Sequence, residues 1–364
     1  MADLSAARAV RPEPFVPRPS AGSGESRLIA LDGLRGVAAL GVLLIHIGYV
    51  GGNPGIAPAA ALSVDLFFML SGFVIGHGFE PKLLGGAMRW RTFMAYRAAR
   101  FFPGLAIGVV LAAAVEICLG RGSAELGRQF VLHLLLLPDP ASPVLFPLNG
   151  VLWTLFFEFV ANAGHAAAVR RLSTPLLAAL VLGCGCAWAW TAGQTGNWGG
   201  GWNWATVAGG FARVGWAYGI GLLLYRLSAS GRIRVPIVPA FLPVGAAALL
   251  LIAPTFDLGA ARVVVPLFVL LPLILLLGAS ASITAPGRRA ASWVGELSYP
   301  LYTMHPPLLL ICAALLGADG GLPILWAIAG CLIVLAAAGV AHFAEAPMRN
   351  RLKDLVTERK AQPA

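Results

Sequence analysis

Charged residues are scarce in this sequence. Only 12% of its 364 residues are Asp, Glu, Lys or Arg, whereas soluble domains carry about twice that fraction. Hydrophobic residues make up 58% of the chain, and they come in blocks of about 18 to 25, the length that crosses a bilayer. This composition excludes a large soluble domain and predicts a multi-pass membrane protein.

Cysteine is also rare. The five cysteines fall within or beside the apolar blocks, and they match neither a disulfide framework nor the spacing of a zinc site. The sequence also lacks a P-loop, a dinucleotide-binding fingerprint and an HExxH motif. We therefore expect no bound metal. No internal repeat of two halves, which is typical of many transporters, is visible either.

The basic residues are spread along the chain. The net charge is +10, but Lys and Arg recur between apolar blocks and form no single patch, so we expect no nucleic-acid partner. If the N-terminus is cytoplasmic, twenty-one of the 26 Lys and Arg residues fall in inside segments and only Arg121, Arg128 and Arg262 fall outside. That asymmetry is the positive-inside pattern. The ten blocks lie at about 33–51, 59–79, 102–119, 149–169, 174–193, 205–225, 237–254, 263–280, 292–316 and 322–344.

The predicted fold is thus an all-α polytopic membrane protein with about ten transmembrane helices and cytoplasmic N- and C-termini. Residues 1–27 are polar and lack the apolar stretch of a signal peptide, so we expect a disordered cytoplasmic tail. Residues 28–347 form the membrane domain, and 348–364 form a basic cytoplasmic tail. Between the second and third spans, residues 80–102 alternate arginines with aromatic residues, which suits an amphipathic helix in the cytoplasmic interface.

The first span carries ionisable residues. Asp32 and Arg35 lie at its first turn, and His46 follows Arg35 by eleven residues. That spacing places Arg35 and His46 on nearly the same face, about 16 Å apart along the axis. Ionisable groups inside a membrane are costly and indicate a functional site. The alternative is that Arg35 anchors the topology and His46 is a packed core residue.

Other spans carry isolated polar groups. The second has Asp65 near its outer end and the small pair Ser71 and Gly72 at mid-membrane, where a helix or a ligand could approach. The fourth has Glu158, which needs a partner, and Arg213 in the sixth span is one candidate. The pair Arg97 and Arg100, spaced i and i+3, either anchors anionic lipid or binds a phosphate.

The ninth span is polar and rich in proline. Ser298, Tyr302 and His305 fall on one helical face. Prolines at 300, 306 and 307 release backbone carbonyls that need other partners. Such a segment is tolerated at membrane depth only where it lines a cavity or is buried in protein. Before the sixth span, Trp198, Trp202 and Trp204 either form an interfacial belt or stack on a sugar.

Six stretches together resemble the bacterial membrane-bound acyltransferase-3 family, which is similar to the O-acetylases of O-antigen and other surface glycans. They are LDGLRGVAALGVLLIH (31–46), SVDLFFMLSGFVI (63–75), RAARFFP (97–103), LWTLFFEF (152–159), GELSYPLYTMHPPLL (295–309) and EAPMR (345–349). They occur in the order of the family and cover the whole chain. The chain departs from the family pattern at Thr154, Pro300 and Pro306.

The resemblance implies transfer of an acyl group, usually acetyl, from cytoplasmic acyl-CoA to a hydroxyl of a carbohydrate, glycolipid or natural product at the bacterial inner membrane. His46 would be the general base, or else the nucleophile, and Asp65 or Glu158 would orient its ring. Family motifs place donor binding at Arg35, Arg97, Arg100, Ser71 and Gly72. We assign acceptor binding to Asp32, Trp153, Arg213, Tyr302 and His305.

A proton- or ion-coupled small-molecule transporter is the competing class. It would also carry Asp, Glu, Arg and His in its spans. The missing repeat and the basic segment after the second span favour the enzyme.

Overall fold

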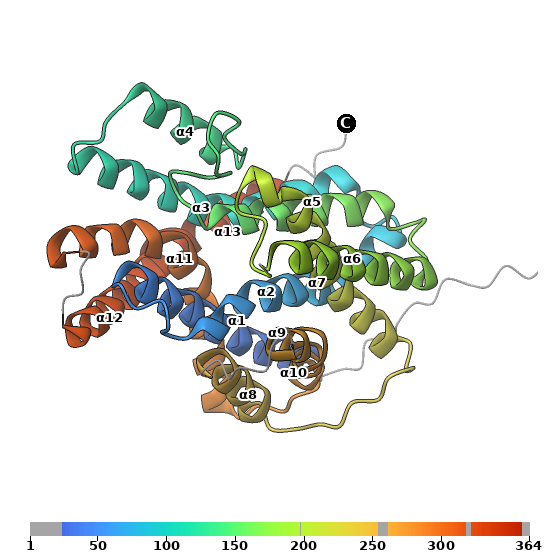
Figure 1. Ribbon diagram of the computed structural model, residues 1–364. Coiled ribbons are helices and arrows are strands. Elements are labelled where there is room, and N and C mark those ends of the chain that lie inside the picture. The colour runs from blue at the N-terminus through green and yellow to red at the C-terminus, as the bar shows by residue number, and fades with distance from the viewer. Residues whose placement is uncertain (1–23, 197, 254–260, 318–321, 359–364) are drawn as a thin grey trace, which may run out of the picture.

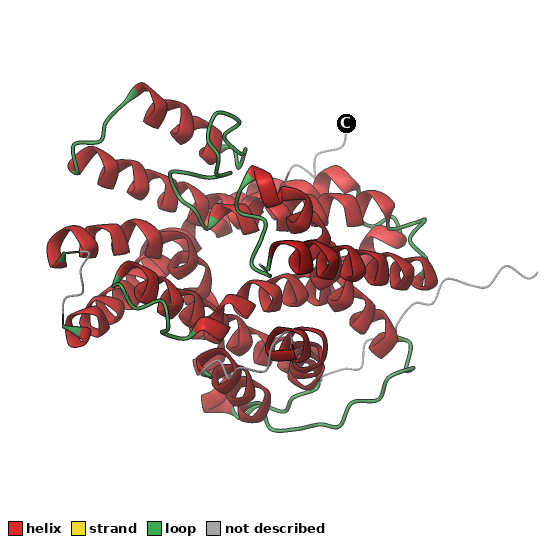
Figure 2. Cartoon of the chain, in the orientation of Figure 1, coloured by secondary structure: helices red, strands yellow, loops and turns green. Residues whose placement is uncertain are grey.

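The apolar blocks fold as helices, because a backbone in lipid must satisfy its own polar groups within its segment. The computed structural model describes residues 24–196, 198–253, 261–317 and 322–358. Across those residues every regular element is a helix, and the β contacts amount to two isolated bridges (Figure 2). The prediction of an all-α chain is confirmed.

The elements follow the predicted blocks closely. The first half of the chain contains α1 (Gly24–Val50), η1 (Pro58–Leu62), α2 (Ser63–Leu84), α3 (Trp90–Cys118), α4 (Ala124–Leu134), α5 (Leu152–Ala168) and α6 (Thr174–Thr195). The second half contains η2 (Trp204–Thr206), α7 (Val207–Ala229), α8 (Phe241–Ile252), α9 (Ala261–Val265), η3 (Pro266–Leu270), α10 (Leu271–Ala279), α11 (Ala285–Leu316), α12 (Pro323–Val340), η4 (Ala341–Glu345) and α13 (Ala346–Glu358).

Fewer helices are long enough to cross a membrane than the ten apolar blocks predicted. Among the described residues, seven helices are long and apolar enough to cross: Leu28–Val50, Pro58–Leu84, Trp90–Cys118, Thr174–Thr195, Trp204–Ala229, Ala285–Leu316 and Pro323–Val356. The other three blocks are helical but short. For example, the 12 residues of α8 extend over about 18 Å, less than a hydrocarbon core of about 30 Å. The chain is a multi-pass membrane protein, but length alone does not establish ten spans.

Two predicted segments differ from the structure. The basic segment after α2 is not a separate interfacial helix, because it forms the first turns of α3, a 29-residue helix in which Pro103 lies without ending it. The predicted N-terminal tail also ends earlier, since helix α1 begins at Gly24 and residues 1–23 lie outside the described residues. The predicted basic C-terminal tail is helical as far as Glu358, because α13 covers Ala346–Glu358.

Glycines set how closely the central helices approach. A Cβ on Gly72 of α2 would lie 2.0 Å from the Tyr218 carbonyl oxygen of α7, and one on Gly108 of α3 would lie 2.7 Å from the Thr303 carbonyl oxygen of α11. Helix α1 packs along α11, with Gly36 against Val294. Figure 1 shows α1, α2, α3 and α11 crossing the middle of the molecule, with α4 outside them. This close packing holds the polar residues of different spans beside one another.

Candidate active site

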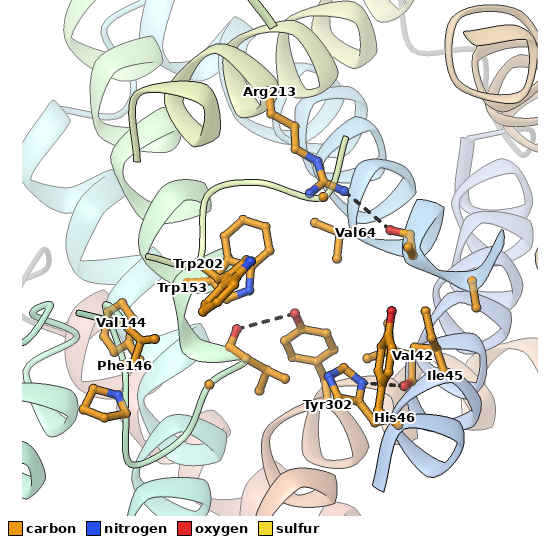
Figure 3. A pocket seen from close by; sticks show the side chains of 17 residues that line it. Val42, Ile45, His46, Val64, Val144, Phe146, Trp153, Trp202, Arg213 and Tyr302 are labelled. Atoms are coloured by element: carbon orange, nitrogen blue, oxygen red, sulfur yellow. Dashed lines mark hydrogen bonds between the residues drawn. The ribbon is translucent and has the colours of Figure 1, made fainter. Parts of the chain in front are cut away.

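A cavity of about 550 Å³ lies between α1, α2, α5, α7 and α11, and residues 144–151 cover part of it (Figure 3). Its wall includes the rings of Trp153, Trp202 and Tyr302 and the guanidinium group of Arg213. In Figure 3 the two tryptophans lie across the cavity from His46. Aromatic walls with a few polar groups are typical of sites for small molecules.

His46 reaches this cavity from α1. Its Nδ1 lies 2.7 Å from the backbone carbonyl oxygen of Val42. A carbonyl can only accept, so Nδ1 carries the proton and Nε2 of the neutral ring is left with a free lone pair. The ring packs against that of His305, with centroids 4.9 Å apart. The arrangement fixes the ring and presents one basic nitrogen, which is what a general base requires.

Arg213 forms a buried ion pair at the same cavity. Its Nε donates a hydrogen bond to Oδ1 of Asp65 and its Nη2 donates one to Oδ2, each over 2.7 Å. Both side chains are almost fully buried, so each charge depends on the other for neutralisation. The guanidinium also lies over the ring of Trp153, 5.6 Å from its centroid. Arg213 thus stabilises the wall and orients Trp153.

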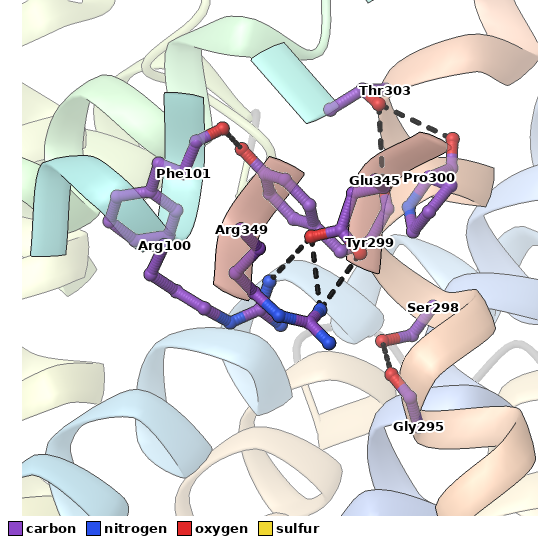
Figure 4. A network of polar contacts seen from close by, with 9 residues as sticks. All are labelled: Arg100, Phe101, Gly295, Ser298, Tyr299, Pro300, Thr303, Glu345 and Arg349. Carbon is purple, nitrogen blue, oxygen red and sulfur yellow. Dashed lines mark hydrogen bonds and ion pairs between the residues drawn. The ribbon is translucent and has the colours of Figure 1, made fainter. Parts of the chain in front are cut away.

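A second group of charged residues lies in the N-terminal halves of α1 and α3 and in η4 and α13, which contact α3. Glu345 accepts from Arg100 (3.2 Å) and from Arg349 (2.8 and 3.0 Å), as Figure 4 shows. Arg35 donates to Asp32 over 3.2 Å. We call Arg35, Arg97, Arg100, Arg349 and Lys353 the basic cluster, because electrostatic interactions link them.

The basic cluster is bordered by carboxylates. Arg35 pairs with Asp32, Arg97 pairs with Glu158, and Arg100 pairs with Glu345. The side chains of Arg35 and Arg100 remain 28% and 25% exposed, so both can reach a ligand. Arginine side chains bind phosphate oxygens through paired hydrogen bonds. The cluster therefore suits a phosphorylated ligand, about 16 Å along α1 from His46.

The comparisons with known proteins agree with the predicted resemblance. The profile of the acyltransferase domain of family 3 matches residues 28–343. This chain belongs to the acyltransferase-3 family. A Rhizobium radiobacter protein named protein 2 in the picA locus is 38% identical over 165 residues, which cover 40% of this chain and 83% of that protein. No solved structure matches the chain.

The predicted carboxylate partner of His46 is wrong for this acyltransferase-3 chain. Asp65 binds Arg213, and Glu158 accepts from Ser71 (2.5 Å) and from Arg97 (2.9 Å). Within the described residues, neither carboxylate bonds to His46. Glu158 also does not pair with Arg213, which was one candidate. A buried carboxylate pairs with the cation that packing places beside it, and sequence distance does not reveal which one that is.

Ser71 and Gly72 are not positioned as donor-binding residues. Ser71 is buried and donates its hydroxyl hydrogen to Glu158. Gly72 lies at the crossing of α2 with α7, where Tyr218 leaves no room for a ligand. The small pair serves helix packing, which was the alternative to ligand approach.

Asp32 and His305, which were also predicted to bind the acceptor, do not line the cavity. Asp32 belongs to the charged end of α1, 14 residues before His46. His305 is completely buried, so its ring cannot touch an acceptor and contacts His46 instead. Of the residues predicted to bind acceptor, Trp153, Arg213 and Tyr302 do line the cavity. Tyr302 is held there by a 2.7 Å hydrogen bond to the Thr154 hydroxyl.

Two groups of residues in the site were given no role by sequence reasoning. The side chain of Asn149 donates a hydrogen bond of 2.8 Å to the backbone carbonyl of Thr303. That carbonyl lacks its helical partner because residue 307 is a proline, which has no N–H to donate to the carbonyl four residues before it. Glu345 and Arg349 complete the basic cluster. The motif EAPMR was a signal for this pair, but only the fold places it beside Arg100. Asn149 had no signal beyond its position before a predicted span.

Proposed function

We propose that this protein is an acyl-CoA-dependent O-acyltransferase of the bacterial inner membrane, with a carbohydrate-like acceptor. One observation carries the proposal: the unprotonated Nε2 of His46 lies at the wall of a cavity, on the same helix as Arg35 of the basic cluster. The family supplies the reaction class, acyl transfer. Donor, acceptor and the role of His46 are our inference.

The donor would bind with its phosphates at the basic cluster. Arg35 and Arg100 are partly exposed and suit a diphosphate or a ribose phosphate. The pantetheine arm would then follow α1 toward His46, which lies about 16 Å from Arg35. A thioester carried on such an arm reaches the cavity while the nucleotide stays at the charged end.

His46 would act as general base. Its Nε2 takes the proton of the acceptor hydroxyl while the hydroxyl oxygen bonds to the thioester carbonyl carbon. The carbon–sulfur bond then breaks, and the sulfur leaves with the proton that His46 returns. The products are an ester and free CoA. The Val42 carbonyl holds Nδ1–H and favours the positive charge that the ring carries between these steps.

The acceptor would lie against Trp153 and Trp202. Both rings belong to the cavity wall, and flat aromatic faces pack on the apolar faces of sugar rings. Arg213 and Tyr302 add polar groups that hydroxyls can meet. A sugar therefore fits the chemistry of this wall better than a fully apolar acceptor does.

The test is release of free thiol from acetyl-CoA by the purified full chain in nanodiscs, with and without methyl glycosides as acceptors. His46→Gln keeps the size and the polar character of the side chain but removes the base. We expect it to lower turnover by roughly 10²- to 10⁴-fold. Arg35→Gln should raise the KM for acetyl-CoA with little change in kcat, because Arg35 lies far from the reacting atoms.

Tyr49→Phe is the matched control, since Tyr49 also lines the cavity and packs beside His46. It should keep turnover within about twofold. Turnover that survives His46→Gln would overturn the role of His46. No turnover of any acyl-CoA by well-folded protein, together with proton-coupled uptake of a solute into vesicles, would favour the transporter instead.

A further inference from the structure

A second cavity of about 230 Å³ adjoins the first. His46, Pro147 and Gly150 line both cavities. His46 therefore lies where the two cavities meet, and the proposed reaction needs only one of them for the acceptor.

The two cavities differ in chemistry. The first contains Arg213, Tyr302 and two tryptophans. The wall of the second is mostly aliphatic side chains and prolines: Val50, Ala112, Pro306, Pro307, Leu309 and Leu310. Its ionisable residues are His46 and, at the end of α3, Glu116. Glu116 is paired with Arg121 over 3.6 Å, so the character of the wall is set by its apolar side chains. Such a space admits a hydrocarbon and disfavours phosphates and carboxylates, which would lose their water there.

The second cavity also lies at the correct end of the donor path. Helices α1 and α11 run in the same direction, since Asp32 lies at Gly295 and His46 at His305. Helix α3 also runs parallel to α11, since Gly104 lies at Tyr299 and Gly108 at Thr303. From Arg35 to Val50 is about 22 Å along α1, and from Arg100 to Ala112 is about 18 Å along α3. A donor with phosphates at the basic cluster and its thioester at His46 has only its acyl tail left to extend further.

We propose that the second cavity binds the hydrocarbon tail of the acyl group and sets the chain length of the donor. This inference rests on the proposed function. The volume of about 230 Å³ corresponds to nearly eight water-sized units of about 30 Å³. A linear tail of about that many non-hydrogen atoms fills it, so butyryl and hexanoyl tails would lie inside the cavity and a dodecanoyl tail would extend beyond it.

The experiment compares thiol release from acetyl-, butyryl-, hexanoyl- and dodecanoyl-CoA by the full chain in nanodiscs. We expect wild type to use butyryl- and hexanoyl-CoA with kcat/KM at least equal to that for acetyl-CoA, and dodecanoyl-CoA at least tenfold less well. Leu310→Trp fills the second cavity. It should lower the hexanoyl-to-acetyl ratio at least tenfold, since one methylene in an apolar pocket changes specificity by about 10- to 200-fold.

A second variant acts in the opposite direction. Leu309→Ala enlarges the second cavity and should raise the dodecanoyl-to-acetyl ratio severalfold. Val144→Trp fills the first cavity and is the control. It should reduce acceptor use without changing the chain-length ratios of acceptor-independent thiol release. Opposite shifts in the two Leu variants separate a specificity effect from a general loss of folding.

Failure of the proposed function and failure of the assignment of the second cavity give different results. If no acyl-CoA is turned over, the proposed function fails. If acetyl-CoA is turned over but wild type rejects butyryl- and hexanoyl-CoA, the assignment of the second cavity is overturned while the enzyme stands. The same holds if Leu310→Trp and Leu309→Ala leave the chain-length ratios unchanged, which would be expected if a membrane lipid occupied this space.

Discussion

At the scale of single residues, packing gives different contacts to two side chains of the same type. Trp202 and Trp204 are two positions apart, and their exposed fractions are 44% and 42%. Trp202 lines the first cavity, whereas Trp204 donates from Nε1 to the Asp139 carbonyl over 3.1 Å. The sequence placed both in one aromatic group. Their roles differ because the loop turns one ring toward the cavity and the other toward residues 139–143.

This difference gives a matched pair of variants. Trp202→Ala should raise the KM for a glycoside acceptor roughly tenfold, because it removes about 1 kcal/mol or more of aromatic contact. Trp204→Ala should leave that KM within about twofold, since its ring binds the loop. Acceptor titrations at saturating acetyl-CoA measure both. Equal effects of the two variants would argue against acceptor stacking at Trp202.

At the scale of elements, helix crossings and one outer helix organise the site. The crossing of α2 with α7 depends on Gly72 and on Gly221, whose added Cβ atoms would each lie 2.0 Å from a carbonyl oxygen of the other helix. That crossing holds Asp65 of α2 against Arg213 of α7. The periodic sequence predicted both helices, but not that these two pair.

Gly72→Ala should therefore destabilise the protein strongly. The added methyl group collides with backbone, which cannot move without separating the helices, and we expect a loss of roughly 3 kcal/mol or more. Gly78→Ala, on the same helix with no heavy atom within 4 Å of its Cβ, should be neutral or stabilise by up to about 1 kcal/mol. Thermal unfolding in detergent measures both. Similar melting for the two variants would contradict the crossing.

Helix α4 carries a pH-sensitive contact outside the membrane spans. His133 is fully buried, and its ring packs on Phe146 of the cavity wall, with centroids 5.0 Å apart. Burial lowers the pKa of His133 to about 4, although Asp139 opposes the shift. Burial acts to raise the pKa of Asp139, but hydrogen bonds from Ala141 and Arg128 lower it overall.

These shifts make the docking of α4 on Phe146 weaker as the pH falls. Above pH 6.5 the His133 ring is neutral whether or not α4 is docked, so docking has its full stability. Between pH 6.5 and 4 only the undocked ring is protonated, and docking weakens by up to about 3 kcal/mol. Hydrogen exchange of residues 124–151, corrected for intrinsic rates, should therefore accelerate at pH 5. His133→Phe should abolish that acceleration, and an unchanged pH dependence in this variant would refute the assignment.

At the scale of the whole molecule, the helix lengths bear on the number of spans, and the charge asymmetry bears on the side of the membrane where the termini lie. Seven described helices are long enough to cross a bilayer, and an odd number would put the termini on opposite sides. The 17 residues of α5 extend about 26 Å, close to the hydrocarbon thickness of about 30 Å. With α5 and the two short apolar helices also crossing, both termini share one side, as the basic loops predict.

Single cysteines test this arrangement in intact cells, with the five native cysteines replaced by alanine. A membrane-impermeant maleimide should label Ala141→Cys directly. It should label Ser230→Cys and Arg351→Cys only after permeabilisation, because positive segments stay inside. All three positions are exposed. Labelling of Arg351→Cys without permeabilisation would place the C-terminus outside and reduce the number of spans to an odd one.

The sequence alone determined the helical membrane class, the positions of the helices and the family. Those properties follow from local composition, because lipid forces each apolar block to satisfy its own backbone, and the motifs are contiguous. The tertiary structure alone decided the partners of the buried charges. Arg213 binds Asp65, Arg97 binds Glu158, and the ring of His46 is held by its own helix. Ion pairing depends on which helices cross, and the paired residues lie up to 245 positions apart in the sequence.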